Sequence, residues 1–447
     1  MMSKQIIEKR RRVLAPVLLI IALAGGLIWT VNAITVSAQG PGAAATAPAR
    51  NAAIAATTAA VLKETSELRE LSILRNVKSG AQSRSEIERM VIKNMDEEST
   101  PAEMHASELV LKKFGLAPPN FEYRKFVIKL LTEQVAGYYD PKAQQFYLAD
   151  WIDLEGQKPV MAHELTHALQ DQHFGLKRFE KWPKGDSDAE LAVHSLIEGD
   201  ATLAMTLYMA KNPMVALAFL KSLGGEGARS EQFKQAPKAL QESLVFPYEQ
   251  GSEWATQLYR KGGWQMVSAA FTKLPESTEQ ILHPDKYFTH ESPVKISLPD
   301  LKSSLGDGWK RGDYDVNGEW GLYLVLDEYL NDNETAKRAA AGWGGDRYEM
   351  YEGPETGQIF LAQLSAWDTP NDAKEFFDAY ITRTLARYKN LGIQEVSSSK
   401  ESETRHEWTT SEGRVVLEIR GSKVAILEGV PPKSNLEQML KLIWQQS

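Results

Sequence analysis

Residues 161–174, MAHELTHALQDQHF, place two histidines four positions apart, with a glutamate directly after the first. Side chains four residues apart in an α-helix lie only about 40° from each other around the axis, so His163 and His167 face the same side. Two imidazoles on one side can share a metal ion. Glu164, turned by about 100° from His163, can stand beside the ion and take a proton from water. The apolar flanks predict a largely buried helix, so the fold must hold this helix in its interior beside a third ligand.

One candidate for the third ligand lies in the same helix. His173 follows His163 by ten residues, which is the spacing of the zinc pattern H-E-x-x-H-x-x-G-x-x-H. The glycine of that pattern breaks the helix, and Gln170 stands in its place here. An unbroken helix would turn His173 about 120° away from His167, so we expect His173 to point elsewhere.

A second predicted helix, residues 189–205 (AELAVHSLIEGDATLAM), holds the preferred third ligand. Glu198 lies thirty-one residues after His167, which leaves room for a loop and an antiparallel return. Two histidines and one glutamate form a known catalytic zinc set. Gly199 costs roughly 1 kcal/mol relative to alanine inside a helix and therefore indicates the close approach of another backbone or side chain. His194, one turn before Glu198 on the same face, stays open as the alternative.

The motif HELTH followed by EGDA is similar to the gluzincin clan of zinc peptidases, the thermolysin-like and aminopeptidase-like group. The segments HELTHALQDQHF, IEGDAT and STEQILHPDKY together resemble a family of largely uncharacterised exported prokaryotic metallopeptidases. The resemblance covers about residues 61–330. It implies one Zn²⁺ per chain, with His163, His167 and Glu198 as ligands and Glu164 as the general base.

The resemblance also raises the question of which residues support these ligands. Thr202 stands where thermolysin-like enzymes carry an aspartate, so Asp171 and Asp200 are the candidates to orient a ligating imidazole. In this clan a downstream histidine or tyrosine stabilises the oxyanion. His283 and Tyr287, in ILHPDKYF, are the candidates for this role.

A β-hairpin is predicted over residues 135–150, VAGYYDPKAQQFYLAD, where aromatic residues flank the turn pair Asp140-Pro141. Its second strand, Gln145–Ala149, directly precedes the metal helix. In zincins an edge strand at this point binds peptide substrate by strand addition. The predicted substrate-binding residues are therefore Gln145, Phe146, Tyr147 and Leu148.

The helical texture extends from Val61 to about Leu330, apart from the hairpin. Pro159 suits the first turn of the metal helix, and Ser187 with Glu190 predicts a capping box where the next helix begins. Beyond about Ala341, strands are predicted in DRYEMYEG, GQIFLAQLSAW, RVVLEIRG and KVAILEGV, with helices near 370–388 and 435–445.

The expected fold class is therefore α+β. A mainly helical zincin-like metallopeptidase core with a small edge-strand sheet is expected over residues 61–335. A smaller α+β domain of unknown role is expected over residues 341–447.

The N-terminus predicts export. Residues 1–12 are basic and are followed by a run without charged residues over 13–38. This run is either a signal peptide, cleaved near Val36-Ser37-Ala38, or a membrane anchor spanning Val13–Val31. Both alternatives place the bulk of the chain outside the cytoplasm, and an uncleaved segment makes the membrane a partner. Residues 39–60, rich in alanine, glycine, proline and threonine, predict a linker.

The composition excludes several classes of function. The chain has no cysteine, which rules out disulfides, thiolate metal ligands and a cysteine nucleophile. A formal net charge of −8 argues against nucleic acid as a partner. The leading hypothesis is a zinc-dependent endopeptidase acting on peptides or proteins. The alternatives are a non-catalytic zincin-fold binding or scaffold protein at the cell envelope, and a zinc hydrolase of a non-peptide amide or ester. Substrate preference and oligomeric state stay open.

Overall fold

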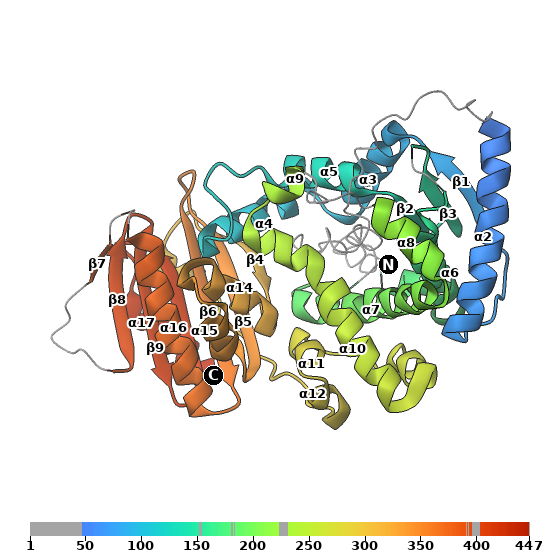
Figure 1. The fold of residues 1–447 in the computed structure, drawn as a ribbon. Helices are drawn as coiled ribbons and strands as arrows, with labels where there is room; N and C mark the ends of the chain where they lie inside the picture. Colours follow the sequence, from blue (N-terminus) through green and yellow to red (C-terminus); the bar gives the residue numbers. More distant parts are fainter. Residues whose placement is uncertain are drawn as a thin grey trace, which may run out of the picture.

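The computed structural model describes residues 47–446, apart from residues 152–153, 180–181, 183, 223–230, 390, 392 and 396–402. The fold is α+β, with a helical N-terminal half and a sheet-based C-terminal half (Figure 1). The basic segment and the signal or anchor segment, expected over residues 1–38, lie outside the described residues. Within the described ranges, no helix is by itself long and apolar enough to cross a membrane. One pair of helices, Ser187–Lys211 and Pro213–Lys221, meets that criterion jointly but is bent by 111°.

The helical half is built around α7, which packs against both α6 and α10. Its helices are α2 (Ala47–Arg69), α3 (Arg84–Glu98), α4 (Pro101–Phe114), α5 (Tyr123–Gln134), α6 (Lys158–Phe174), α7 (Ser187–Lys211), α8 (Pro213–Ser222), α9 (Glu231–Lys234), α10 (Lys238–Ala270), α11 (Thr278–Leu282) and α12 (Pro284–Thr289), with a 3-10 turn at Leu176–Arg178. The two helices expected to carry the metal ligands are confirmed as α6 and α7. Pro159 lies in the first turn of α6, as predicted.

Helix α2 corrects the expectation of a linker over residues 39–60. The described part of that segment is helical from Ala47, and the helix continues to Arg69. Alanine has the highest helix propensity, so an alanine-rich segment folds as a helix wherever it can bury one face. Ile54, Thr58 and Val61 supply that face, and all three are buried where α2 packs on α6 and α7.

The predicted capping box at the start of α7 is wrong. Asp186 is the N-cap residue, and its carboxylate accepts a hydrogen bond from the backbone N–H of Ala189. The backbone N–H and the hydroxyl of Ser187 both donate to the Asp315 carboxylate instead. Asp315, from a strand of the C-terminal half, therefore accepts the hydrogen bonds that the Glu190 side chain would have accepted in a capping box.

A three-stranded sheet lies beside α6 and contains the expected hairpin. Its strands are β1 (Lys78–Gln82), β2 (Gly137–Asp140) and β3 (Gln145–Ala149), in the order β1-β3-β2. Strand β3 pairs in parallel with β1 and antiparallel with β2. The expectation that Gln145–Leu148 forms the edge strand is therefore wrong, because β1, which is remote in sequence, covers the second side of β3. The edge strand nearest α6 is β2.

The C-terminal half is a seven-stranded sheet whose neighbouring strands are all antiparallel. In spatial order the strands are β4 (Lys310–Asp315), β5 (Trp343–Glu352), β6 (Ile359–Trp367), β10 (Lys423–Val430), β9 (Gly413–Arg420), β8 (Arg405–Thr410) and β7 (Ile393–Glu395). Its helices are α13 (Lys302–Leu305), α14 (Gly318–Leu330), α15 (Asn333–Ala340), α16 (Pro370–Tyr388) and α17 (Leu436–Gln446). The four predicted strands and both predicted helices are confirmed. The sheet starts at Lys310, before the boundary expected at 341.

The two halves share one hydrophobic core. One face of the sheet packs against α14, α15 and α16, and the same cluster of buried residues includes α3, α4 and α5. The other face packs against α17. Helices α6 and α7 pack within two other clusters of buried residues, α6 with α2 and β3, and α7 with α10 and α11.

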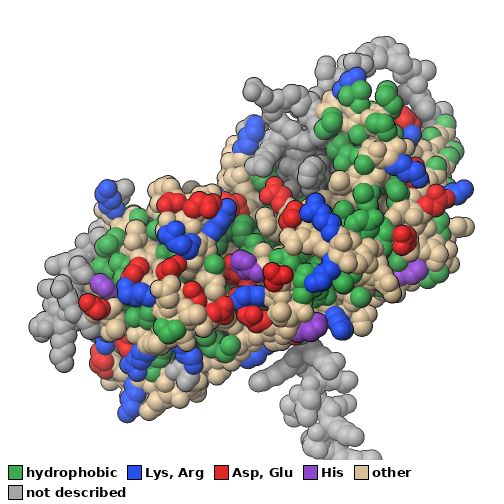
Figure 2. Space-filling model, turned by 60° about the horizontal axis from the view of Figure 1, so that its bottom comes forward, with side chains coloured by type: hydrophobic (Ala, Val, Ile, Leu, Met, Phe, Trp, Pro, Cys, Tyr) green, Lys and Arg blue, Asp and Glu red, His purple; other side chains and the backbone are tan. Residues whose placement is uncertain are grey.

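On the side shown in Figure 2, acidic and basic side chains are interspersed and form no patch of one sign.

Candidate metal centre

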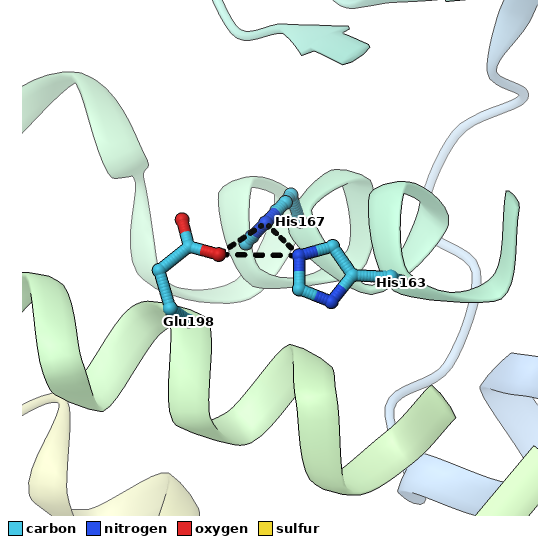
Figure 3. Close-up of side chains that lie close together, drawn as sticks. All are labelled: His163, His167 and Glu198. Atoms are coloured by element: carbon cyan, nitrogen blue, oxygen red, sulfur yellow. Dashed lines mark hydrogen bonds and ion pairs between the residues drawn. The ribbon is translucent and has the colours of Figure 1, made fainter. Parts of the chain in front are cut away.

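Helices α6 and α7 bring three potential metal ligands together. The Nε2 atoms of His163 and His167 are 3.1 Å apart. Glu198 Oε2 lies 3.1 Å from His163 Nε2 and 3.5 Å from His167 Nε2. The two rings and the carboxylate point toward one another from facing helices (Figure 3), and all three side chains are buried. This group has the donor atoms and the spacing to hold one metal ion.

The close contact between α7 and α10 fixes the position of Glu198. A Cβ atom on Gly199 would lie 2.1 Å from the carbonyl oxygen of Gly251 in α10. A Cβ atom on Gly251 would lie 2.3 Å from the carbonyl oxygen of Ser195. The close approach predicted at Gly199 is therefore confirmed, and the neighbouring group is the backbone of Gly251. The same crossing brings the buried Tyr248 ring over His163 with centroids 6.0 Å apart, a contact that no sequence signal indicates.

Glu164 lies beside the three ligand candidates and is 1% exposed. Its Oε2 accepts a hydrogen bond of 3.0 Å from the backbone N–H of Tyr139 in β2. Its Oε1 is buried and has no hydrogen-bond partner among the described residues. Burial raises the pKa of the Glu164 carboxyl. The side chain thus has one fixed oxygen and one oxygen that is available to a proton.

The site favours positive charge between its three side chains. Burial alone would raise the pKa of Glu198, but the charge of His167 and the hydrogen bond to His163 outweigh it and lower that pKa to about 2. Burial likewise lowers the pKa of His167, yet the Glu198 carboxylate outweighs burial and raises it to about 10. In the metal-free protein a proton therefore occupies the place that a cation can take.

Neither rival third ligand belongs to this group. Helix α6 runs unbroken to Phe174, and His173 Nε2 lies 2.8 Å from the Ser72 carbonyl oxygen at the protein surface. His194 is buried in α7, one turn before Glu198, and its atoms are not part of the three-ligand cluster found among the described residues. Burial lowers the pKa of His194 to about 4, so this imidazole is neutral at pH 7.

Asp171, expected to orient an imidazole, fixes neighbouring elements instead. Its Oδ2 accepts hydrogen bonds from the hydroxyl of Tyr139 at 2.9 Å and from Arg75 at 2.6 Å. These bonds tie β2 and the segment after α2 to α6. Asp171 thereby positions Tyr139, the residue whose backbone holds Glu164.

Asp200, the second residue expected to orient an imidazole, reaches His167 through an intermediate. Asp200 Oδ2 accepts a hydrogen bond of 2.9 Å from the amide nitrogen of Gln170, and Gln170 Oε1 lies 2.9 Å from His167 Nδ1. Arg69 forms a buried ion pair with Asp200. In the sequence, Gln170 was notable only because it replaces the glycine of the longer zinc pattern. No sequence feature predicted its contact with His167.

His283 and Tyr287, the candidates for stabilising an oxyanion, are bonded away from α6. His283 Nε2 lies 2.8 Å from a carboxylate oxygen of Glu319 in α14. The Tyr287 hydroxyl donates a hydrogen bond of 2.7 Å to the Lys273 carbonyl, and its ring packs on Trp254. These contacts give both side chains a part in docking α11 and α12.

A second group of carboxylates, Glu279, Glu291 and Asp368, has metal-like spacing. Lys286 already occupies its centre, because its Nζ donates to the three side chains at 2.7, 2.7 and 2.6 Å. The ammonium group satisfies this cluster, so the two-helix centre is the stronger candidate among the described residues.

Comparison with known proteins finds a similarity for the sheet and none for the metal group. Residues 305–440 match a family model described as "Domain of unknown function (DUF8575)". No curated protein and no solved structure matches the chain. The matched region covers the C-terminal sheet from α13 into α17, and α6 and α7 lie outside it.

Proposed function

We propose that this chain is a zinc-dependent peptidase, an endopeptidase that acts on peptides or proteins outside the cytoplasm. One observation carries the proposal. Two imidazole nitrogens and one carboxylate oxygen converge from α6 and α7, and a second buried carboxylate, that of Glu164, is close enough to interact electrostatically with all three. Two histidines and a glutamate, with one open position, form a set that catalytic zinc sites use.

The spacing of the ligand atoms supports zinc. Ligand atoms about 2.1 Å from a tetrahedral zinc ion lie about 3.4 Å from one another. The three separations here are 3.1, 3.1 and 3.5 Å. His163, His167 and Glu198 would therefore hold the ion with little rearrangement.

Zinc in such a site supplies Lewis-acid polarisation of a substrate carbonyl and lowers the pKa of water. The proton transfer falls to Glu164, whose pKa burial raises toward the range of a general base. The backbone N–H of Tyr139 holds one of its oxygens and leaves Oε1 to receive a proton from the attacking water and to pass it to the leaving amine.

The substrate strand is proposed at β2 in place of β3. Strand β2 is hydrogen-bonded on one side to β3, and the backbone N–H of Tyr139 points from its other side toward Glu164. An extended peptide added along this edge would pass the metal group. Gly137–Asp140 is therefore the segment that we expect to bind peptide backbone, through outward-facing groups other than the Tyr139 N–H, which already donates to Glu164.

The proposal is tested by Glu164→Gln. The three ligand candidates are untouched, so the variant should bind zinc like the wild type. Removal of the general base should lower peptidase activity by about 10²- to 10⁴-fold. Zinc content and casein cleavage are measured on the same preparations. Undiminished cleavage by the variant would refute the assignment of Glu164 as the general base.

The third ligand is tested by comparing zinc content in Glu198→Ala, His194→Ala and His173→Ala. We expect only Glu198→Ala to lose zinc, because only its carboxylate meets both ligand imidazoles. His194→Ala is the matched control for a buried residue on the same face of α7. Zinc binding without hydrolysis of any peptide would favour the scaffold function, and hydrolysis limited to other amides or esters would favour the third alternative.

A further inference from the structure

We infer that Gln170 is a positioning residue that fixes the orientation and the tautomer of His167. Asp200 and Arg69 hold Gln170 in place for this role. The inference rests on the proposed function in so far as it treats His167 as a metal ligand. Its structural part concerns hydrogen bonds that exist with or without the ion.

The orientation of the Gln170 amide follows from its partners. Its Nε2 atom donates hydrogen bonds to the carbonyl oxygen of Ile197, at 3.0 Å, and to Asp200 Oδ2, at 2.9 Å. Both partners are oxygens that only accept, so the NH₂ group must face them. The amide oxygen is left to face His167 Nδ1 at 2.9 Å.

This arrangement determines where the proton of His167 sits. An amide oxygen can only accept a hydrogen bond, so His167 Nδ1 must carry hydrogen. In the neutral ring the lone pair then resides on Nε2. That atom is the one that lies 3.1 Å from His163 Nε2 and 3.5 Å from Glu198 Oε2. The ring is thus prepared to bind a metal ion before the ion arrives.

Arg69 stabilises this orientation of the Gln170 amide by holding Asp200 in place. The side chains of Arg69 and Asp200 are 0% exposed, and two guanidinium nitrogens donate to the two carboxylate oxygens. The arginine is itself fixed by two bonds of 3.1 Å to the Ser268 hydroxyl and by the Trp264 ring, 4.4 Å from its guanidinium carbon. A bidentate pair of this kind cannot rotate without breaking a buried charge pair, so Asp200 presents one oxygen to Gln170.

The position of Gln170 in the sequence suits this role. It lies three residues after His167, one turn along the same side of α6, where side chains of a helix meet. In the H-E-x-x-H-x-x-G-x-x-H pattern a glycine at this place breaks the helix. Here the helix continues to Phe174, and the side chain serves the second histidine.

The inference is tested with Gln170→Met, which keeps the volume but removes the acceptor. In the metal-free protein, taken to a pH at which the His167 ring is neutral, ¹⁵N NMR should show the Nδ1–H form in the wild type and its loss in the variant. Zinc affinity, measured by competition with a chelator, should fall about 10- to 100-fold. Gln363→Met is the matched control, because Gln363 is 0% exposed and its amide donates to Asp346 at 3.1 Å, within the C-terminal sheet. It should lose comparable stability without a change in zinc affinity.

A second variant separates positioning from folding. Gln170→Glu keeps an acceptor at His167 Nδ1 and, with a proton on its other oxygen, keeps a donor to Asp200 Oδ2 while the Arg69–Asp200 pair stays intact. It should recover most of the zinc affinity and the Nδ1–H form. Unchanged tautomer and zinc affinity in Gln170→Met would overturn the inference. A wild type that shows the tautomer but binds no zinc would overturn the proposed function and leave the positioning role standing.

Discussion

Glu190 is a buried carboxyl on α7, one turn before His194. It has no cationic partner among the described residues, and the charges that act on it, those of Asp315 and Glu98, are negative. Burial, reinforced by these two acids, raises the pKa of Glu190 to about 8. The folded protein therefore retains a proton on this side chain at neutral pH.

This proton makes stability depend on pH. Folding raises the pKa of Glu190, so the folded state binds more protons than the unfolded state between about pH 4.5 and 8. The protonated Glu190 therefore contributes its full stability below about pH 4.5, and this contribution is lost as the pH rises to 8. Glu190→Gln should match the wild type near pH 5 and exceed its unfolding free energy at pH 8.5 by on the order of a few kcal/mol. Denaturant unfolding at both pH values measures the difference. Parallel pH curves for the two proteins, with the exposed Glu88→Gln as control, would refute it.

At this scale the sequence was informative where chemistry is local. Helical spacing was enough to place His163 and His167 on one side of one helix and Glu164 beside them. Glu198 could be predicted from the sequence because the glycine that follows it indicated that another part of the chain approaches closely. Gln170 was not, since its role depends on acceptors that α7 supplies only after folding. The spatial position of His283 depends in the same way on docking to α14.

At the scale of elements, the contact of α7 with α10 controls the geometry of the centre. Gly199 and Gly251 face each other so closely that neither position has room for a side chain. A displaced α7 would carry Glu198 away from the two histidines of α6.

Gly199→Ala tests this contact. The added methyl group meets a backbone carbonyl, which cannot rotate aside as a side chain would, so we expect the unfolding free energy to fall by about 3 kcal/mol. Zinc affinity should fall with it. Thermal unfolding and zinc titration measure both effects. Glu253→Ala, at an exposed position of α10 two residues from Gly251, should change neither; an equal effect at both sites would show that the crossing is not the cause.

The elements that the sequence predicted are those with a clear local signal. Helix α6, the β2–β3 hairpin and strands β5, β6, β9 and β10 were recognisable from apolar, aromatic and β-branched runs bounded by turn or helix-start residues. The part of α2 before Val61 was missed, because this alanine-rich start has few charges to mark an exposed face. Strand β1, KSGAQ, carries no alternation at all, and its parallel pairing with β3 arises from tertiary contacts.

At the scale of the whole molecule, a buried charge network joins the two halves. Glu428 in β10 is 0% exposed and accepts hydrogen bonds from Arg383 and Arg387 of α16. The same arginines donate to the backbone carbonyls of Phe114 and Lys113, at the end of α4. The C-terminal sheet is thus tied to the helical half by charge as well as by the shared core.

Glu428→Gln should weaken both halves together. Arg383 would lose its carboxylate partner and Arg387 would keep only Glu412, so we expect a loss of about 3 to 5 kcal/mol in a single cooperative transition. Burial would raise the pKa of Glu428, but Arg383 and then Arg387 lower it to about 2, so its contribution is present above about pH 4.5 and is lost as pH falls toward 2. Calorimetry at pH 7 and pH 3 measures both. Glu437→Gln, which removes an exposed partner of Arg405, should cost under about 1 kcal/mol; two separate transitions would contradict the coupling.

The reach of Arg69 from the end of α2 to Asp200 has a consequence for transplanting the centre. A two-helix cassette of α6 and α7 would carry all three donor atoms to a new scaffold, yet it would leave Asp200 without its counter-ion and Gln170 without a fixed partner. It would also lack the α10 glycine that lets α7 lie where it does. The smallest portable unit therefore begins at Ala47 and extends through α10, so the motif that looks most modular in the sequence is among the least graftable parts of the molecule.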